Sequence, residues 1–134
     1  MRFSNMRCIL LLLITASFAS GCAALREKRR KNEKLHPSSY LEAKIIFQWQ
    51  DSLTNDIHAR VQVRNKAKFT SYSYLSLVTS IQNEKGDTIC TAFFDEMGGV
   101  DAKGMKIFDR VMDCPGKNLV MKVSEITGRP VRKE

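Results

Sequence analysis

Histidine is scarce in this sequence, since only His36 and His58 occur among its 134 residues. His36 stands in a segment with the composition of a linker, and His58 is expected on the outward face of a strand. Neither lies in a local motif that would place it between a nucleophile and an orienting carboxylate. The chain also lacks the H-E-x-x-H, C-x-x-C and G-x-S-x-G motifs and any glycine-rich phosphate loop. These absences predict a protein that is not an enzyme, with no catalytic residue and no metal site.

No apolar run is long enough to span a membrane comfortably. The apolar run Cys8–Phe18 has eleven residues, whereas a membrane-spanning helix takes about 20. Arg2 and Arg7 supply positive charge on its N-terminal side. This order of parts is typical of an export signal, which we expect over residues 1–21.

Ala19-Ser20-Gly21-Cys22 follows the apolar run directly. The sequence resembles the bacterial lipobox, in which the cysteine thiol is lipidated and the chain is cut just before it. The resemblance implies cleavage between Gly21 and Cys22, with Cys22 as the acylated N-terminus and no other cofactor. Ala23, in place of an aspartate, implies sorting to the outer membrane, facing the periplasm; the inner membrane and the cell surface are the alternatives. An ordinary secretory signal, with Cys22 as a bystander, would require no lipid.

Positive charge is concentrated in the two tails of the chain. The net charge is +8, yet residues 43–125 hold eleven basic against ten acidic side chains. That distribution argues against a nucleic-acid partner for the folded part. The larger cluster lies in a tether that we expect over residues 22–42; its basic residues are Arg26, Lys28, Arg29, Arg30, Lys31 and Lys34. Next to an anionic membrane surface such residues contribute about 1 kcal/mol each; the alternative is a solvated, disordered tether.

From residue 43 onward the sequence alternates between apolar and polar residues, as half-buried antiparallel strands do. Six strands are predicted, over residues 43–49, 57–65, 74–82, 87–94, 105–113 and 118–126. In the first, alternation puts Ala43, Ile45, Phe47 and Trp49 on one face. Short strands with frequent turns predict an all-β domain over residues 43–126, an antiparallel sandwich of six or seven strands with a small barrel as the alternative. Residues 127–134 are expected to form a basic tail.

A series of positions over residues 43–125 resembles the immunoglobulin-like domains called FxLYD, which occur in bacterial envelope lipoproteins. These positions are Val61, Val63, Asn65, the strand Tyr74–Ile81, Asn83, Gly86, Asp101, Gly104 and the strand Met105–Val111. Where the family's naming motif has Phe-x-Leu-Tyr-Asp, this chain has Thr79-Ser80-Ile81-Gln82-Asn83. The resemblance implies an immunoglobulin-like sandwich that serves as an accessory or interaction module.

Cys90 and Cys114 remain once Cys8 has left with the signal and Cys22 carries lipid. An even pair in an oxidising compartment favours a disulfide. Two reduced thiols at unrelated positions are the alternative. The spacing is too short for the inter-sheet bridge of antibody domains, so Trp49 is not expected to pack against it.

Two further segments offer alternatives to a protein-binding surface. Carboxylates at residues 95, 96 and 101 could ligate Ca²⁺, but they lack the spacing of a calcium loop, and a solvated loop is favoured. Phe69, Tyr72 and Tyr74 near Lys66 and Lys68 could stack on a glycan, although their spacing favours packing in the sheet. We therefore expect a membrane-anchored module that binds an envelope protein or a cell-wall component; the alternatives are a metal-dependent or glycan-binding domain and a small periplasmic enzyme.

Overall fold

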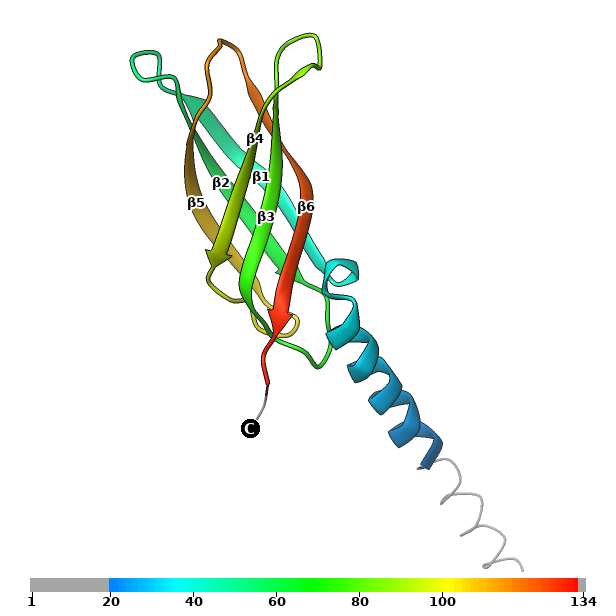
Figure 1. Cartoon of the computed structure of the whole chain (residues 1–134). Coiled ribbons are helices and arrows are strands. Elements are labelled where there is room, and N and C mark those ends of the chain that lie inside the picture. The colour runs from blue at the N-terminus through cyan, green and yellow to red at the C-terminus, as the bar shows by residue number, and fades with distance from the viewer. Residues whose placement is uncertain (1–19, 133–134) are drawn as a thin grey trace, which may run out of the picture. The chain divides into compact units, whose positions relative to one another are not determined.

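The computed structural model describes residues 20–132 (Figure 1), so most of the predicted export signal lies outside the described residues. The chain forms two compact units that divide between Asn32 and Glu33. In the first unit, residues 20–32 are helical, and residues 33–35 continue the helix at the start of the second. One 3-10 turn, η1 (Pro37–Ser39), precedes the first strand. The segment expected to serve as a tether therefore has regular structure over most of its length.

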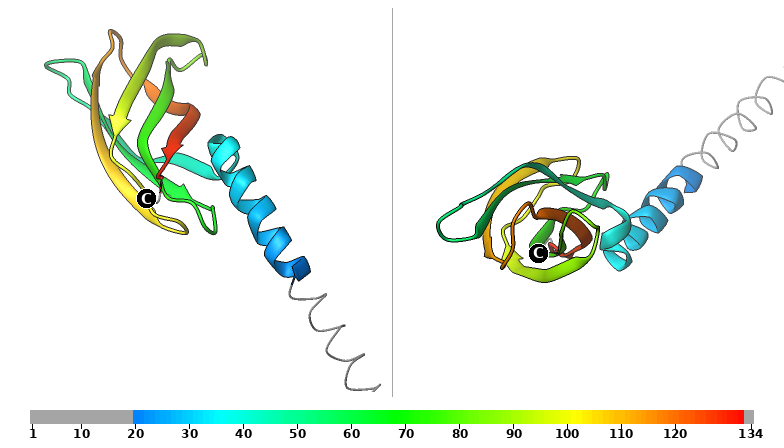
Figure 2. Two further views of the ribbon diagram at one scale, coloured as in Figure 1. Left: turned by 60° about the horizontal axis from the view of Figure 1, so that its bottom comes forward. Right: turned by 90° about the horizontal axis from the view of Figure 1, so that it is seen from above.

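Six antiparallel strands form two three-stranded sheets, ordered β1-β2-β5 and β4-β3-β6 (Figure 1). Their bounds are β1 (Leu41–Gln50), β2 (Asp56–Asn65), β3 (Tyr72–Gln82), β4 (Thr88–Met97), β5 (Met105–Asp113) and β6 (Val120–Pro130). The two sheets face each other in the view from above (Figure 2). With β2 beside β5 and β3 beside β6, the strands take the places of A, B, E and C′, C, F in an immunoglobulin-like sandwich. The predicted all-β sandwich is confirmed.

The core is made by the inward faces of β2 and β3, the central strands of the two sheets. As predicted, the apolar side chains at every second position of β2 are buried; these are Ile57, Ala59, Val61 and Val63. In β3, Leu75, Leu77 and Ile81 are buried in the same alternating pattern, together with the polar Thr79. A central strand with one buried face has its register specified by that face, which is why simple alternation succeeds here.

The face predicted for β1 is wrong beyond Ile45, because the strand contains a β-bulge. Ile45 pairs with Val61, but Phe47 pairs with Arg60, so Ile46 is an extra residue in the ladder. One inserted residue exchanges the two faces of the strand that follows. Phe47 and Trp49 are consequently 60% and 47% exposed.

Both turns that depend on glycine are present. Gly86, in the β3–β4 hairpin, has φ +84, and Gly116, in the β5–β6 connection, has φ +135. Asn83 closes the hairpin, since its side-chain oxygen accepts hydrogen bonds from the backbone N–H groups of Lys85 and Asp87. The β1–β2, β3–β4 and β5–β6 connections lie together at one end of the sandwich (Figure 1), which we call the distal end.

Glu33 ties the start of the second unit to the β2–β3 connection. Its side chain has no exposed surface, and its carboxylate accepts hydrogen bonds from the backbone N–H groups of Lys68, at 2.9 Å, and Phe69, at 3.0 Å. The buried Tyr72 hydroxyl donates to the Glu33 carbonyl oxygen at 2.6 Å. Residues before β1 are therefore part of the folded unit.

Alkaline pH should destabilise the fold through Tyr72. Burial, together with the charge of Glu33 and the nearby Tyr40, raises the pKa of Tyr72 to about 12, against about 10 in an unfolded chain. The stabilisation is complete below about pH 10 and is lost as the pH rises from there through about 12. Tyr72→Phe should cost about 1 kcal/mol at neutral pH, because it removes one hydrogen bond, and should lose less stability over the alkaline window. Denaturant unfolding at about pH 8 and about pH 11 measures both.

Tyr74→Phe is the matched control, because Tyr74 is 56% exposed. It should follow the parent protein at both pH values. If Tyr72→Phe lost as much stability as the parent between them, ionisation of Tyr72 would not be the cause.

Candidate binding surface

The structure places Cys22 on the helical residues of the first unit, where it is exposed and is the free cysteine among residues 20–132. Gly21 and the predicted basic residues are exposed as well; these are Arg26, Lys28, Arg29, Arg30, Lys31 and Lys34. At 100° per helical residue, Arg26 and Arg30 share one side of the helix, while Lys28 and Lys31 lie on another. The positive charge surrounds this segment and is not confined to one face.

The predicted disulfide between Cys90 and Cys114 is confirmed. Cys90 lies on β4, and Cys114 directly follows β5, with Cα atoms 6.2 Å apart. Because β4 and β5 belong to different sheets, the bridge joins the two layers. It differs from the antibody bridge, which joins the strands corresponding to β2 and β6.

Phe69, Tyr72 and Tyr74, for which packing in the sheet was favoured over glycan stacking, do not share one surface. Tyr72 is 1% exposed and belongs to the core, whereas Tyr74 is 56% exposed. The Tyr74 ring centroid lies 5.7 Å from the Arg129 guanidinium, and the Phe69 ring lies beneath the Lys68 ammonium at the same distance. These rings do not form one stacking platform.

The expected acidic loop begins only after Met97, because β4 includes Asp95 and continues to Met97. Within residues 20–132 no three His, Cys, Asp or Glu side chains are grouped as metal ligands. In the same part of the chain, no helix is both long and apolar enough to cross a membrane.

The outer face of the β1-β2-β5 sheet carries a set of exposed side chains that the sequence alone did not identify. Strand register places His58 between Trp49 and Val111 in one row across the sheet. In the next row, Arg60 lies between Phe47 and Asp109. We call this set the aromatic face; its residues are Phe47, Trp49, His58, Arg60, Asp109 and Val111. They line a shallow depression of about 260 Å³.

Two side-chain pairs order the aromatic face. The Trp49 and His58 rings are stacked, with centroids 4.1 Å apart and planes 3° from parallel. Arg60 and Asp109 form a two-point ion pair, in which Nε donates to Oδ1 at 2.8 Å and Nη2 donates to Oδ2 at 3.4 Å. The hydrogen bond from Arg60 lowers the pKa of Asp109, so the pair keeps both charges at neutral pH. The aromatic face therefore has two stacked rings beside an ion pair whose two charges cancel.

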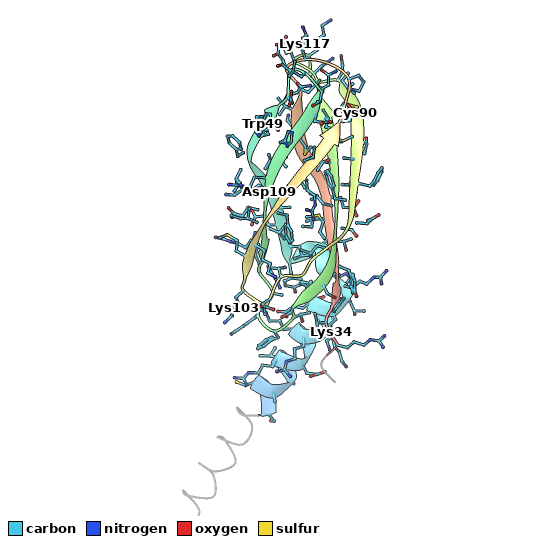
Figure 3. All side chains as sticks on the ribbon, turned by 90° about the vertical axis from the view of Figure 1, so that its left-hand side faces the viewer. Lys34, Trp49, Cys90, Lys103, Asp109 and Lys117 are labelled. Carbon is cyan, nitrogen blue, oxygen red and sulfur yellow. A yellow bond between two sulfur atoms is a disulfide. The ribbon has the colours of Figure 1, made fainter. Side chains whose placement is uncertain are left out.

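A second, larger depression of about 480 Å³ lies at the distal end and also includes Trp49. We call it the distal depression; its lining residues include Trp49, Asp51, Lys117 and Asn118. Figure 3 shows Trp49 and Lys117 toward the same end of the strands, with Lys34 and Lys103 at the other.

Inward-facing glutamines of β1 hold one wall of the distal depression. Gln50 Nε2 donates to the Gly116 carbonyl oxygen at 2.8 Å, and the Gln48 side-chain oxygen accepts from the Met121 N–H at 2.9 Å. Both glutamines point inward because of the bulge at Ile46, which also turns Trp49 outward. The same irregularity therefore turns Trp49 outward and the two glutamines toward the segment 116–121.

The chain matches no protein-family model, no curated protein and no solved structure. Inferences about its function therefore depend on its own residues. The aromatic face is rich in the residue types that dominate binding energy at interfaces, Trp and Arg above all. It offers stacking and hydrogen bonding to a partner.

Proposed function

We propose that this protein is a bacterial envelope lipoprotein, acylated at Cys22, that presents its sandwich as a binding module for an envelope component. Its place is the outer membrane, facing the periplasm. The observation that carries the binding function is the exposed aromatic face on the β1-β2-β5 sheet. The proposal assigns no catalytic residue and no cofactor other than the lipid, and it includes membership of the FxLYD group of envelope domains.

The order of parts at the N-terminus supports the anchor. An export-type segment leads into Gly21-Cys22, and the basic cluster Arg26–Lys34 follows after three residues. Each buried acyl CH₂ contributes about 0.8 kcal/mol, so several chains hold a protein at a bilayer where one would hold it only reversibly. The basic side chains add attraction to anionic headgroups, which falls off within a Debye length.

The exposure of the aromatic face supports binding. Phe47, Trp49 and Val111 are 60%, 47% and 53% exposed. Phe47 and Trp49 lie on β1 and Val111 lies on β5, with His58 and Arg60 of β2 between them. Large apolar side chains exposed together on one face of a sheet are typical of an interaction site. The ion pair between Arg60 and Asp109 gives the face a fixed polar centre, which favours specificity.

A photo-crosslinker placed on this face tests the binding function. With p-benzoylphenylalanine in place of Phe47, the full chain in living cells should form a covalent adduct with an envelope component. The adduct should be far more abundant than with the crosslinker in place of Phe93, since a photoreactive ketone bonds only to groups that it touches. Immunoblotting of detergent-solubilised envelope measures the adduct.

Phe93 is the matched control because it is 69% exposed but lies on β4, in the other sheet. No adduct at position 47, or equal adducts at both positions, would contradict the assignment of the aromatic face.

A further inference from the structure

Trp49 presents one face of its ring to solvent at the distal end. Its other face is covered by His58 of β2, 4.1 Å away and parallel within 3°. Because β1 is an edge strand of its sheet, the uncovered face is turned away from β2. A flat, partly exposed indole held rigidly from behind is suited to stack on the C–H face of a pyranose ring, which is apolar and equally flat.

Polar side chains around the distal depression are held in place before any ligand arrives. Asp51 Oδ1 accepts a hydrogen bond from the Leu53 N–H at 2.8 Å. Asn118 Nδ2 donates to Glu84 Oε1 at 2.8 Å. A carboxylate and an amide of this kind can pair with hydroxyl groups, which need partners when they leave water. Such pre-organisation lowers the entropy cost of binding.

Charge in the distal depression is balanced. Among its lining residues only Asp51 and Lys117 are charged, and their charges are opposite. An anionic ligand would meet the carboxylate and a cationic ligand would meet the ammonium, whereas a neutral polyhydroxyl ligand can bond to both. The volume of about 480 Å³ lies within the range of small-molecule sites.

We infer that the distal depression binds a neutral saccharide, with Trp49 as the stacking platform and Asp51, Lys117 and Asn118 as partners of its hydroxyl groups. This inference rests on the proposed function and names the chemical class of its envelope component. The proposed saccharide site lies at the distal end of the sandwich. The β2–β3 connection, which Glu33 contacts, lies at the opposite end.

Trp49 makes the test direct, because it is the one tryptophan of the chain. The full chain, purified in a detergent without sugar headgroups, is titrated with triacetylchitotriose, cellotriose and maltotriose while Trp fluorescence is followed. At least one trisaccharide should produce a saturable change. Calorimetry should then show affinity at least about fivefold lower for Trp49→Ala and for Asn118→Ala, as expected when an anchoring contact is lost.

Phe93→Ala provides the control, since it removes an exposed ring that does not line the depression, and it should bind like the parent. If no trisaccharide gives a saturable signal, or if Trp49→Ala and Asn118→Ala bind like the parent, the saccharide inference is overturned. An adduct between a protein and the crosslinker at position 47 would in that case still support the proposed function. Saccharide binding without any such adduct at position 47 would leave this inference standing and contradict the aromatic face.

Discussion

A Cys22→Ser variant is expected to lose its lipid and to leave the membrane fraction almost completely. Serine cannot form the thioether that carries the acyl group, so the several chains that contribute about 0.8 kcal/mol per buried CH₂ are absent. The basic residues that follow, Arg26–Lys34, contribute about 1 kcal/mol each at an anionic surface and are screened by salt. Metabolic labelling with an alkyne fatty acid, followed by membrane fractionation, measures both losses.

Cys8→Ser is the matched control, because Cys8 lies in the predicted export segment, outside the described residues, and is not expected to carry lipid. This variant should be labelled and should sediment with the membrane like the parent. Mass spectrometry should find the parent protein cut before Cys22 and heavier by its acyl groups. An unmodified full-length chain in the soluble interior of the cell would contradict the anchor, the proposed address and the cleavage between Gly21 and Cys22 together.

The central strands were predictable because each has a single buried face. In β2, and in β3 from Leu75 onward, every second side chain is buried. Period-two alternation in the sequence therefore distinguishes the inward from the outward side chains. Gly86 likewise marks its turn through a backbone conformation that other residues rarely adopt. These features depend on local sequence, which is why they required no knowledge of the partner strands.

The faces of the edge strands β1 and β5 were not predictable in the same way. In β1, three consecutive apolar residues, Ile45-Ile46-Phe47, interrupt the alternation and were the one signal of a bulge. In β5, both faces carry apolar residues; Ile107 is 52% exposed, whereas Phe108 packs against the core. The position of Trp49, and with it the candidate site, depends on the bulge. Sequence alternation therefore missed the candidate binding surface while predicting the fold.

The burial of two polar residues was also not predictable from the sequence. Asn65 is 1% exposed; its amide nitrogen donates to the carbonyl oxygens of Thr70 and Asp101, and its oxygen accepts from the Ala67 N–H. Glu33 stands within a run of charges that suggests a solvated tether, yet it is completely buried. Asn65 reaches Asp101 36 residues away, and Glu33 reaches Lys68 and Phe69 35 and 36 residues away. Because such partners are distant in sequence, local composition does not reveal that these polar groups are buried and bonded.

Replacing both Cys90 and Cys114 by alanine should lower the free energy of unfolding by about 3 to 4 kcal/mol, the chain-entropy value for a loop of this length. The two cysteines are 24 residues apart, and β4 and β5 are not hydrogen-bonded neighbours. In a small domain, whose total stability is about 5 to 15 kcal/mol, that loss is large. Denaturant unfolding of the full-chain parent and the double variant measures it, provided that both have the same m-value.

The bridge also supports the candidate site, because Cys114 lies two residues before the segment 116–119, which forms one wall of the distal depression. A reduced parent protein should therefore match the double alanine variant in stability, and both should bind a trisaccharide more weakly than the oxidised parent. Lys106→Ala, an exposed change at the end of β5 far from Cys114, provides the control and should shift stability by no more than about 0.5 kcal/mol. If the double variant and the oxidised parent had free energies of unfolding within about 0.5 kcal/mol of each other, the stabilising role of the disulfide would be rejected. The two sheets would then hold the β5–β6 connection without the bridge.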